Sequence, residues 1–199
     1  MTYSCRVLFA KINPSNHTSV STYLMLIHMQ KGIVFTEKKK GWVLSMNMEY
    51  EIVTLEEKIA VGVSARTNNT SLEMGTVIGG LWNRFYNDGI YVSIPKKTNA
   101  KALGIYTDYA GDEKADYTAF VGCETAEAPA ENEYAVCRIP AGQYAKFVVR
   151  GNMVQAVAEA WQEIWQMNLP RAFQCDFEEY QDDDMSDNAE IHIYVGLRE

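Results

Sequence analysis

The stretch Phe-Gln-Cys-Asp-Phe-Glu-Glu-Tyr at residues 173–180 alternates apolar and polar side chains, which is typical of a β-strand with two different faces. The faces are Phe173, Cys175 and Phe177 on one side and Asp176, Glu178 and Tyr180 on the other. A carboxylate beside aromatic rings can bind a lipophilic cation, because the ring faces and the carboxylate both attract positive charge. The alternative is a solvated strand edge that leads into an acidic loop, since charged residues are usually exposed.

The segments before and after this strand follow one order twice, namely strand, helix, strand, strand. The first half is expected to contain strand residues within 49–67, a helix that starts at a Thr70/Glu73 capping box and stops at Gly89, and strands at 103–110 and 117–123. The second half is expected to contain one long strand at 133–150 with a kink at 139–142, a helix that begins at Asn152, and strands at 173–180 and 191–197.

Short matches in sequence support an internal duplication. Phe120-Val121-Gly122 corresponds to Tyr194-Val195-Gly196, and Asp108-Tyr109 corresponds to Glu179-Tyr180. We therefore expect an α+β fold over residues 48–199, with halves at about 48–125 and 133–199. Its two strand-helix-strand-strand units would pair their antiparallel sheets around a pseudo-twofold axis and leave a cleft for a ligand near that axis.

Residues 1–47 differ in composition from the rest of the chain. They carry six Lys and Arg residues against one acid, whereas residues 48–199 carry 12 against 25. We expect residues 1–47 to be a weakly ordered extension, which does not resemble a signal peptide, a membrane span or a helix-turn-helix domain. The acidic body disfavours nucleic-acid binding, because phosphate binding needs a basic surface. The chain is expected to act in the cytoplasm without direct nucleic-acid or membrane contact.

The cysteines and histidines show no metal-ligand spacing, so neither a metal site nor another cofactor is expected. Cys5, Cys123, Cys137 and Cys175 contain no Cys-x-x-Cys pair and are interpreted as free thiols. Eight acids and no Lys or Arg lie between Asp176 and Glu190. They either attract cations to the mouth of a cleft or form a solvated turn.

Five short motifs occur in an order that resembles the GyrI-like small-molecule-binding family, which includes the effector-binding domains of multidrug-responsive AraC-type and MerR-type regulators. The motifs are residues 50–53, residues 139–147, the Trp161 helix ending at Leu169-Pro170, the Phe-Glu-x-Tyr motif at 177–180, and residues 191–195. The likeness covers about residues 48–199, and the chain looks like a stand-alone member because it lacks the regulators' DNA-binding domain.

The resemblance implies an aromatic pocket for amphipathic, often cationic molecules, with the glutamate of the Phe-Glu-x-Tyr motif as the counter-charge. That glutamate is Glu178 here, and Glu179 is the alternative because a shift of one residue exchanges the two faces. Tyr180 and Tyr194 are expected on the Glu178 side of the sheet. Tyr106, on the equivalent strand of the first half, and Trp165, at the edge of the second helix, complete the predicted ligand-binding set, although Trp165 fits the core equally well.

Two other functions remain open from the sequence. The first is hydrolysis of electrophilic small molecules, in which Glu178 would act as general base and Tyr180 or Tyr194 as hydrogen-bond donor, by analogy with some GyrI-like proteins. The second is inhibition of a macromolecular target such as DNA gyrase. Binding is favoured over enzymatic activity because no other catalytic arrangement is recognisable. Homodimer formation is left open.

Overall fold

The computed structural model describes residues 33–38, 41–46, 48–129, 134–181 and 188–198, which belong to two units, Met1–Asn47 and Met48–Glu199. In the first unit, strands β1 (Ile33–Lys38) and β2 (Gly41–Met46) pair in antiparallel fashion. The other residues of the expected extension at 1–47 lie outside the described residues, and so does the acidic loop at 182–187.

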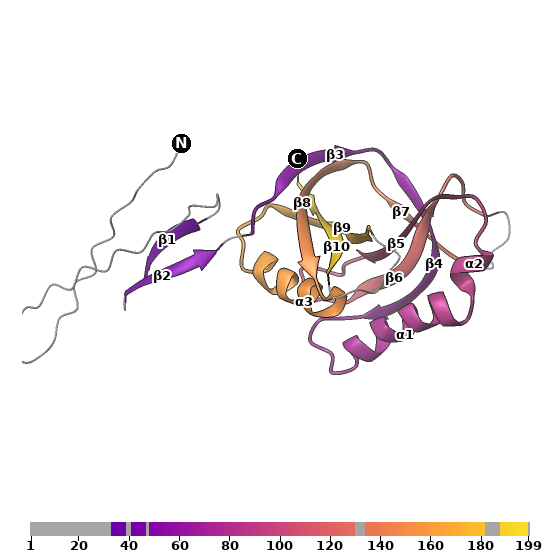
Figure 1. Cartoon of the computed structure of the whole chain (residues 1–199), viewed down its shortest axis with the longest axis horizontal. Coiled ribbons are helices and arrows are strands. Elements are labelled where there is room, and N and C mark those ends of the chain that lie inside the picture. Colours follow the sequence, from indigo (N-terminus) through magenta and orange to yellow (C-terminus); the bar gives the residue numbers. More distant parts are fainter. Residues whose placement is uncertain (1–32, 39–40, 47, 130–133, 182–187, 199) are drawn as a thin grey trace, which may run out of the picture. The chain divides into compact units, whose positions relative to one another are not determined.

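The second unit is built on an eight-stranded antiparallel sheet that curls on itself (Figure 1), in the order β3-β8-β10-β9-β5-β6-β4-β7. Its strands are β3 (Glu51–Leu55), β4 (Lys58–Thr67), β5 (Lys97–Thr107), β6 (Tyr117–Thr125), β7 (Ala135–Ile139), β8 (Gly142–Gly151), β9 (Arg171–Tyr180) and β10 (Ala189–Leu197). The helices are α1 (Met74–Asn87), α2 (Ile90–Ser93) and α3 (Met153–Ile164). None of the helices among the described residues is long and apolar enough to span a membrane.

The predicted duplication is confirmed, since β4-α1-β5-β6 and β8-α3-β9-β10 follow the same order and meet where β5 pairs with β9. The two remaining strands are exchanged between the halves. Strand β3 precedes β4 in the chain but pairs with β8, and β7 precedes β8 but pairs with β4. Each half therefore completes the sheet of the other half.

The predicted single strand over residues 133–150 is wrong, because β7 and β8 are separate strands in different parts of the sheet. Pro140 lacks the N–H that would continue the ladder, and Gly142 adopts a φ of 151°, which favours glycine. The kink at this point is thus a change of strand partner.

The predicted match of Asp108 with Glu179 is also wrong by one residue. Ile105 is the partner of Phe120, and Phe177 is the partner of Tyr194. Because Phe120 and Tyr194 correspond, Ile105 corresponds to Phe177, and the next residue, Tyr106, corresponds to Glu178.

The helices cover one face of the sheet. Leu81 and Phe85 of α1 pack with β4, β5 and β6, while Trp161 and Ile164 of α3 pack with β8, β9 and β10. Side chains of Trp82 and Tyr106 contact both clusters, so the helix-covered face is continuous at the junction of the halves. The opposite face carries the third cluster, which includes Ile105, Phe120, Tyr144, Phe177 and Tyr194. Burial of each such side chain stabilises the fold by about 1.5 to 3 kcal/mol.

Helix ends agree only in part with the sequence. Asn152 caps α3 as predicted, because its side chain accepts hydrogen bonds from the N–H groups of Val154 and Gln155. The predicted capping box of Thr70 and Glu73 is wrong, since α1 begins at Met74 without a side-chain cap.

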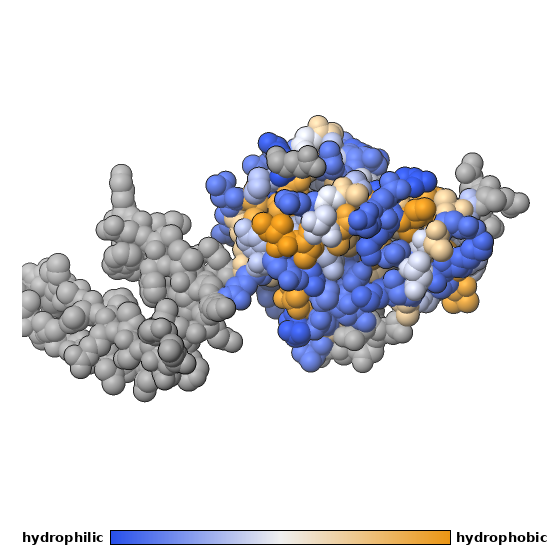
Figure 2. Space-filling view, turned by 90° about the horizontal axis from the view of Figure 1, so that it is seen from above, coloured by the Kyte–Doolittle hydropathy of each residue, from blue (hydrophilic) through white to orange (hydrophobic). Residues whose placement is uncertain are grey.

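Figure 2 shows that hydrophilic residues surround separate apolar clusters on one side of this unit.

Candidate effector-binding site

A buried carboxylate lies at the junction of the two halves. Glu178 of β9 is only 1% exposed, and its Oε1 accepts hydrogen bonds from Trp161 Nε1 at 2.6 Å and from the Tyr106 hydroxyl at 2.8 Å. Its Oε2 accepts a hydrogen bond from the Tyr180 hydroxyl at 2.7 Å. Three neutral donors thus converge on one carboxylate, which satisfies its oxygens but adds no positive charge.

Strand register creates the space for this carboxylate. Gly104 of β5 is the partner of Glu178, and a Cβ at Gly104 would lie 2.9 Å from Glu178 Oε2. The donors come from three elements, because Tyr106 is on β5, Tyr180 is on β9 and Trp161 is on α3. The duplication thus places Tyr106 and Glu178, which occupy equivalent positions, within hydrogen-bond distance of each other.

Burial dominates the electrostatics of this site. It raises the pKa of Glu178 above the usual value, and the hydrogen bonds from Trp161, Tyr180 and Tyr106 offset part of that rise. Burial, followed by the charge of Glu178, raises the pKa of the Tyr106 and Tyr180 hydroxyls well above the usual value. Both hydroxyls therefore remain protonated donors.

Aromatic rings continue from the carboxylate toward the surface. Trp82 of α1 packs edge-on against Tyr180 with ring centroids 5.0 Å apart, and the exposed Tyr86 stacks on Trp82 at 6.0 Å. On the α3 side, Trp165 is 39% exposed and lies 6.3 Å from Trp161. Rings from both helices thus surround Glu178.

Glu179, the alternative counter-charge, lies on the opposite face of β9. Its carboxylate pairs with Lys101 Nζ at 2.9 Å and lies 4.0 Å from Lys58 Nζ. Burial alone would raise the pKa of Glu179, but the hydrogen bonds from Gln181 and Lys101 and the nearby lysine charges lower it overall. This carboxylate already has its own cations.

Tyr194 was expected on the Glu178 side of the sheet, and this expectation is wrong. Tyr194 is the β10 partner of Phe177, and the two rings stack with centroids 4.4 Å apart. Directly paired residues of antiparallel strands share a face, and the β10 partner of Glu178 is Ile193. Tyr106 and Tyr180 donate hydrogen bonds to Glu178, and Trp165 packs against Trp161, which does the same.

A second buried carboxylate lies two residues before Glu178. Asp176 is fully buried, and its Oδ2 accepts hydrogen bonds from Arg171 Nη2 at 2.7 Å and from the Tyr109 hydroxyl at 2.8 Å. Its Oδ1 accepts a hydrogen bond from the Gly196 N–H at 2.9 Å. In contrast to Glu178, Asp176 has an internal cation.

The fold agrees with comparisons to known proteins. A family model described as Cass2, integron-associated effector binding protein, matches residues 51–197. The chain belongs to this family. The match confirms the GyrI-like resemblance and makes the protein an effector-binding protein, that is, a binder of small molecules. No curated protein sequence matches the chain.

Several solved structures share the fold of this effector-binding protein. The integron cassette protein from the mobile metagenome of Vibrio cholerae is 28% identical, with a TM-score of 0.61 over 75% of this chain and 95% of that one. SAV2435, solved with tetraphenylphosphonium bound, is 21% identical, with a TM-score of 0.63 over 76% and 94%. A putative transcription regulation protein from Staphylococcus aureus MU50 is 24% identical, with a TM-score of 0.59 over 76% and 99%.

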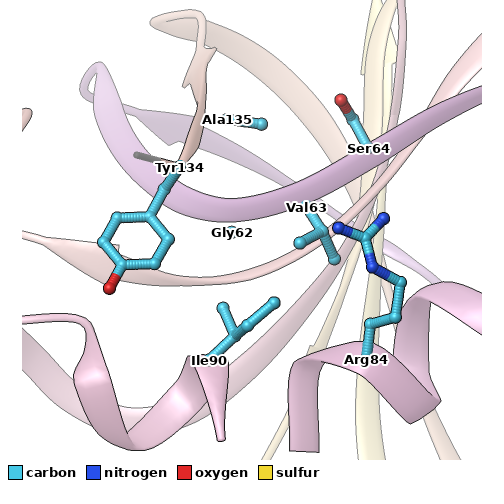
Figure 3. A pocket seen from close by; sticks show the side chains of 7 residues that line it. All are labelled: Gly62, Val63, Ser64, Arg84, Ile90, Tyr134 and Ala135. Atoms are coloured by element: carbon cyan, nitrogen blue, oxygen red, sulfur yellow. The ribbon is translucent and has the colours of Figure 1, made fainter. Parts of the chain in front are cut away.

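The effector-binding protein has a hollow of about 300 Å³ away from Glu178, between α1, α2 and strands β4 and β7 (Figure 3). It is lined by Gly62, Val63, Ser64, Arg84, Ile90, Tyr134 and Ala135. Figure 3 shows Arg84 rising from α1 toward Val63 and Ser64. None of the ligand-binding residues predicted from the sequence lines this hollow.

The close approach of Gly104 to Glu178 makes a prediction about stability. Gly104→Ala is expected to lower the free energy of unfolding by about 1 to 3 kcal/mol, because the new methyl group would displace a fully packed carboxylate. Urea denaturation measures this change. Gly80→Ala is the control, since it lies in α1 and its added Cβ would meet nothing within 4 Å beyond the chain neighbours and the adjacent backbone of the helix. It is expected to stabilise the protein by about 0.5 to 1 kcal/mol. Equal effects of the two substitutions would contradict the predicted clash.

Proposed function

We propose that this effector-binding protein binds amphipathic organic cations, with Glu178 as the counter-charge. One observation carries the proposal: among the described residues, Glu178 is the buried carboxylate whose hydrogen-bond partners are all neutral, whereas Asp176 pairs with Arg171 and Glu179 with Lys101. A desolvated charge without an opposite charge is costly, and a cationic ligand supplies that charge.

The rings around Glu178 suit the apolar part of such a ligand. Trp82, Tyr106, Trp161 and Tyr180 lie around one carboxylate, and each cation-π contact adds about 0.5 to 2 kcal/mol. In this conformation the carboxylate is covered, so a ligand reaches it only if side chains of α1 or α3 turn aside. The exposed rings of Tyr86 and Trp165 are the first that an approaching cation would meet.

The comparison with SAV2435 supports the choice of ligand class, because that protein of the same fold was solved with tetraphenylphosphonium, a lipophilic cation. The same cation serves as a probe here. Tetraphenylborate has the same shape and the opposite charge, so the pair isolates the effect of charge.

The test is a calorimetric titration of the full chain with each probe. Tetraphenylphosphonium is expected to bind and to raise the melting temperature, because a ligand that binds only the folded state stabilises it. Tetraphenylborate is expected to do neither. Equal binding of both ions would overturn the role of a carboxylate counter-charge.

Affinity is also expected to depend on pH. Burial raises the pKa of Glu178, and only the ionised carboxylate attracts a cation. The Kd for tetraphenylphosphonium, whose charge is permanent, should therefore fall as the pH rises from 5 to 8. Asp176 and Arg171, on the same face of β9, already form an ion pair with each other, and Glu179 on the opposite face pairs with Lys101. Titrations at several pH values measure the effect, and Glu178→Gln should abolish the slope.

A further inference from the structure

Two buried carboxylates follow each other on the helix-covered face of β9. Asp176 and Glu178 are 0% and 1% exposed, and residues two apart in a strand lie on one face about 7 Å apart. Tyr106 connects them, because it is the β5 partner of Asp176 and its hydroxyl donates to Glu178. Trp161 connects them as well, since its N–H bonds to Glu178 and its ring lies 6.0 Å from the Arg171 guanidinium.

Several contacts hold Arg171 in place. Its side chain is 7% exposed, its Nη2 bonds to Asp176, and its guanidinium lies 4.4 Å from the centre of the Phe173 ring. Phe173 has a φ of 53°, a conformation that non-glycine residues rarely adopt, and its ring also packs edge-on against Tyr109. Arg171 thus has a fixed position, which a flexible surface arginine would not have.

We infer that Arg171 is a built-in counter-ion that occupies Asp176 and thereby restricts the Glu178 site to amphiphiles with a single positive charge. This inference rests on the proposed function. A ligand with one charge pairs with Glu178. A second charge on the ligand would find Asp176 already neutralised and the positive Arg171 nearby, so it would be buried without a partner.

Two probes of nearly equal shape test this inference. N-methyl-4-phenylpyridinium carries one positive charge, and N,N′-dimethyl-4,4′-bipyridinium carries two. Calorimetric titration of the full chain is expected to give at least tenfold weaker binding for the dication. Equal or tighter binding of the dication would overturn this inference but not the proposed function. If neither probe binds and tetraphenylphosphonium does not bind either, the proposed function itself is wrong.

Variants of the ion pair separate the role of Arg171 from a general preference for one charge. Arg171→Met frees the Asp176 carboxylate, so the ratio of the two affinities should shift at least fivefold toward the dication. Asp176→Asn leaves Arg171 with only the partly exposed Glu113, whose Oε2 lies 3.9 Å from Arg171 Nη1, so the net positive charge near the site rises, and both affinities should fall, that of the dication more. Arg84→Met, a charge-matched change at an exposed arginine, should leave the ratio unchanged.

The double variant Arg171→Met/Asp176→Asn provides a folded reference, because it removes both buried charges together. It should keep the wild-type preference for the monocation. Circular dichroism checks the fold of each variant. An unchanged ratio of the two affinities in a folded single variant would overturn the role of Arg171. If neither single variant folds, the comparison of the two probes on the wild-type protein tests the inference.

Discussion

Glu178→Gln is expected to weaken the binding of tetraphenylphosphonium by about 100-fold. Removing one partner of a desolvated charge pair costs about 2 to 5 kcal/mol, and each 1.4 kcal/mol is a factor of ten in affinity. Glutamine keeps the shape of the side chain and can still accept hydrogen bonds from Trp161 and Tyr106 through Oε1, so charge is the main change. Calorimetric titration of the variant and the wild type measures the loss.

The matched control is Glu179→Gln, at the neighbouring position on the opposite face of β9. Glu179 pairs with Lys101, so its loss should change the affinity for tetraphenylphosphonium by less than about threefold. Similar losses at the two positions would indicate a general effect of the protein's negative charge. In that case the pairing of the ligand with Glu178 would be wrong.

The same substitution should not reduce stability at high pH. A pKa that is raised in the folded state means that the folded protein holds this proton more tightly than the unfolded chain does. The stabilisation from that proton is complete below the unfolded pKa and is lost as the pH rises through the folded pKa. At pH 8, Glu178→Gln should therefore be at least as stable as the wild type.

Urea denaturation at pH 8 and at pH 4 measures this difference. The advantage of the variant should become small at pH 4, just below the unfolded pKa of about 4.3, where Glu178 is protonated in the folded protein and mostly protonated in the unfolded chain. A loss of binding together with a gain in stability would show that Glu178 serves the ligand at the expense of the fold. A variant that is clearly less stable at pH 8 would mean that the three hydrogen bonds to Glu178 matter more than the buried charge.

The fold was largely predictable because its evidence is local. Alternation within the strands, helical spacing of apolar residues and the repeated order of elements all appear in short windows of sequence. The exchange of β3 and β7 was not predictable, because their local pattern is the same whichever half they join. Likewise, the face of Tyr194 depends on which β9 residue it pairs with, and a shift of one residue reverses it.

The neighbours of Glu178 were predicted only in part. Tyr106 and Tyr180 were identified from strand positions, whereas Trp82 and Trp161 resemble ordinary core residues in a helix. Their contacts at the site arise because the duplication brings both helices to one face of the sheet. Gly104 gave no signal in the sequence, since its importance lies in the atom it lacks next to a carboxylate on another strand.

The pairing of Arg171 with Asp176 contradicts a simple reading of the strand. Residues five apart in a regular strand lie on opposite faces. In the pairing of β10 with β9, Val195 pairs with Asp176, but Leu197, two residues further along β10, pairs with Arg171, which is five residues away on β9. The ladder is therefore irregular at this point. Phe173, with its positive φ, lies within this irregular segment. The resulting bend brings the two charges together, and it was not visible in the alternation of residues 173–180.

Arg171→Met is expected to lower the free energy of unfolding by about 3 to 5 kcal/mol, because it leaves the fully buried Asp176 without its cation. Asp176→Asn should also be destabilising but less so, since the guanidinium keeps the partly exposed Glu113 at 3.9 Å. The double variant should recover most of the loss, because a neutral pair of similar volume is often as stable as a buried ion pair. Urea denaturation of the four proteins gives the coupling energy.

An exposed pair of the same kind provides the matched control. Arg138 Nη1 lies 2.7 Å from Glu57 Oε1, the same distance as in the buried pair, but both side chains are more than half exposed. Arg138→Met should therefore change the free energy of unfolding by less than about 1 kcal/mol, because water already screens the charges. If Arg171→Met were equally mild, Asp176 would not depend on its internal cation. It could then accept a second ligand charge, and the restriction to monocations would lose its physical basis.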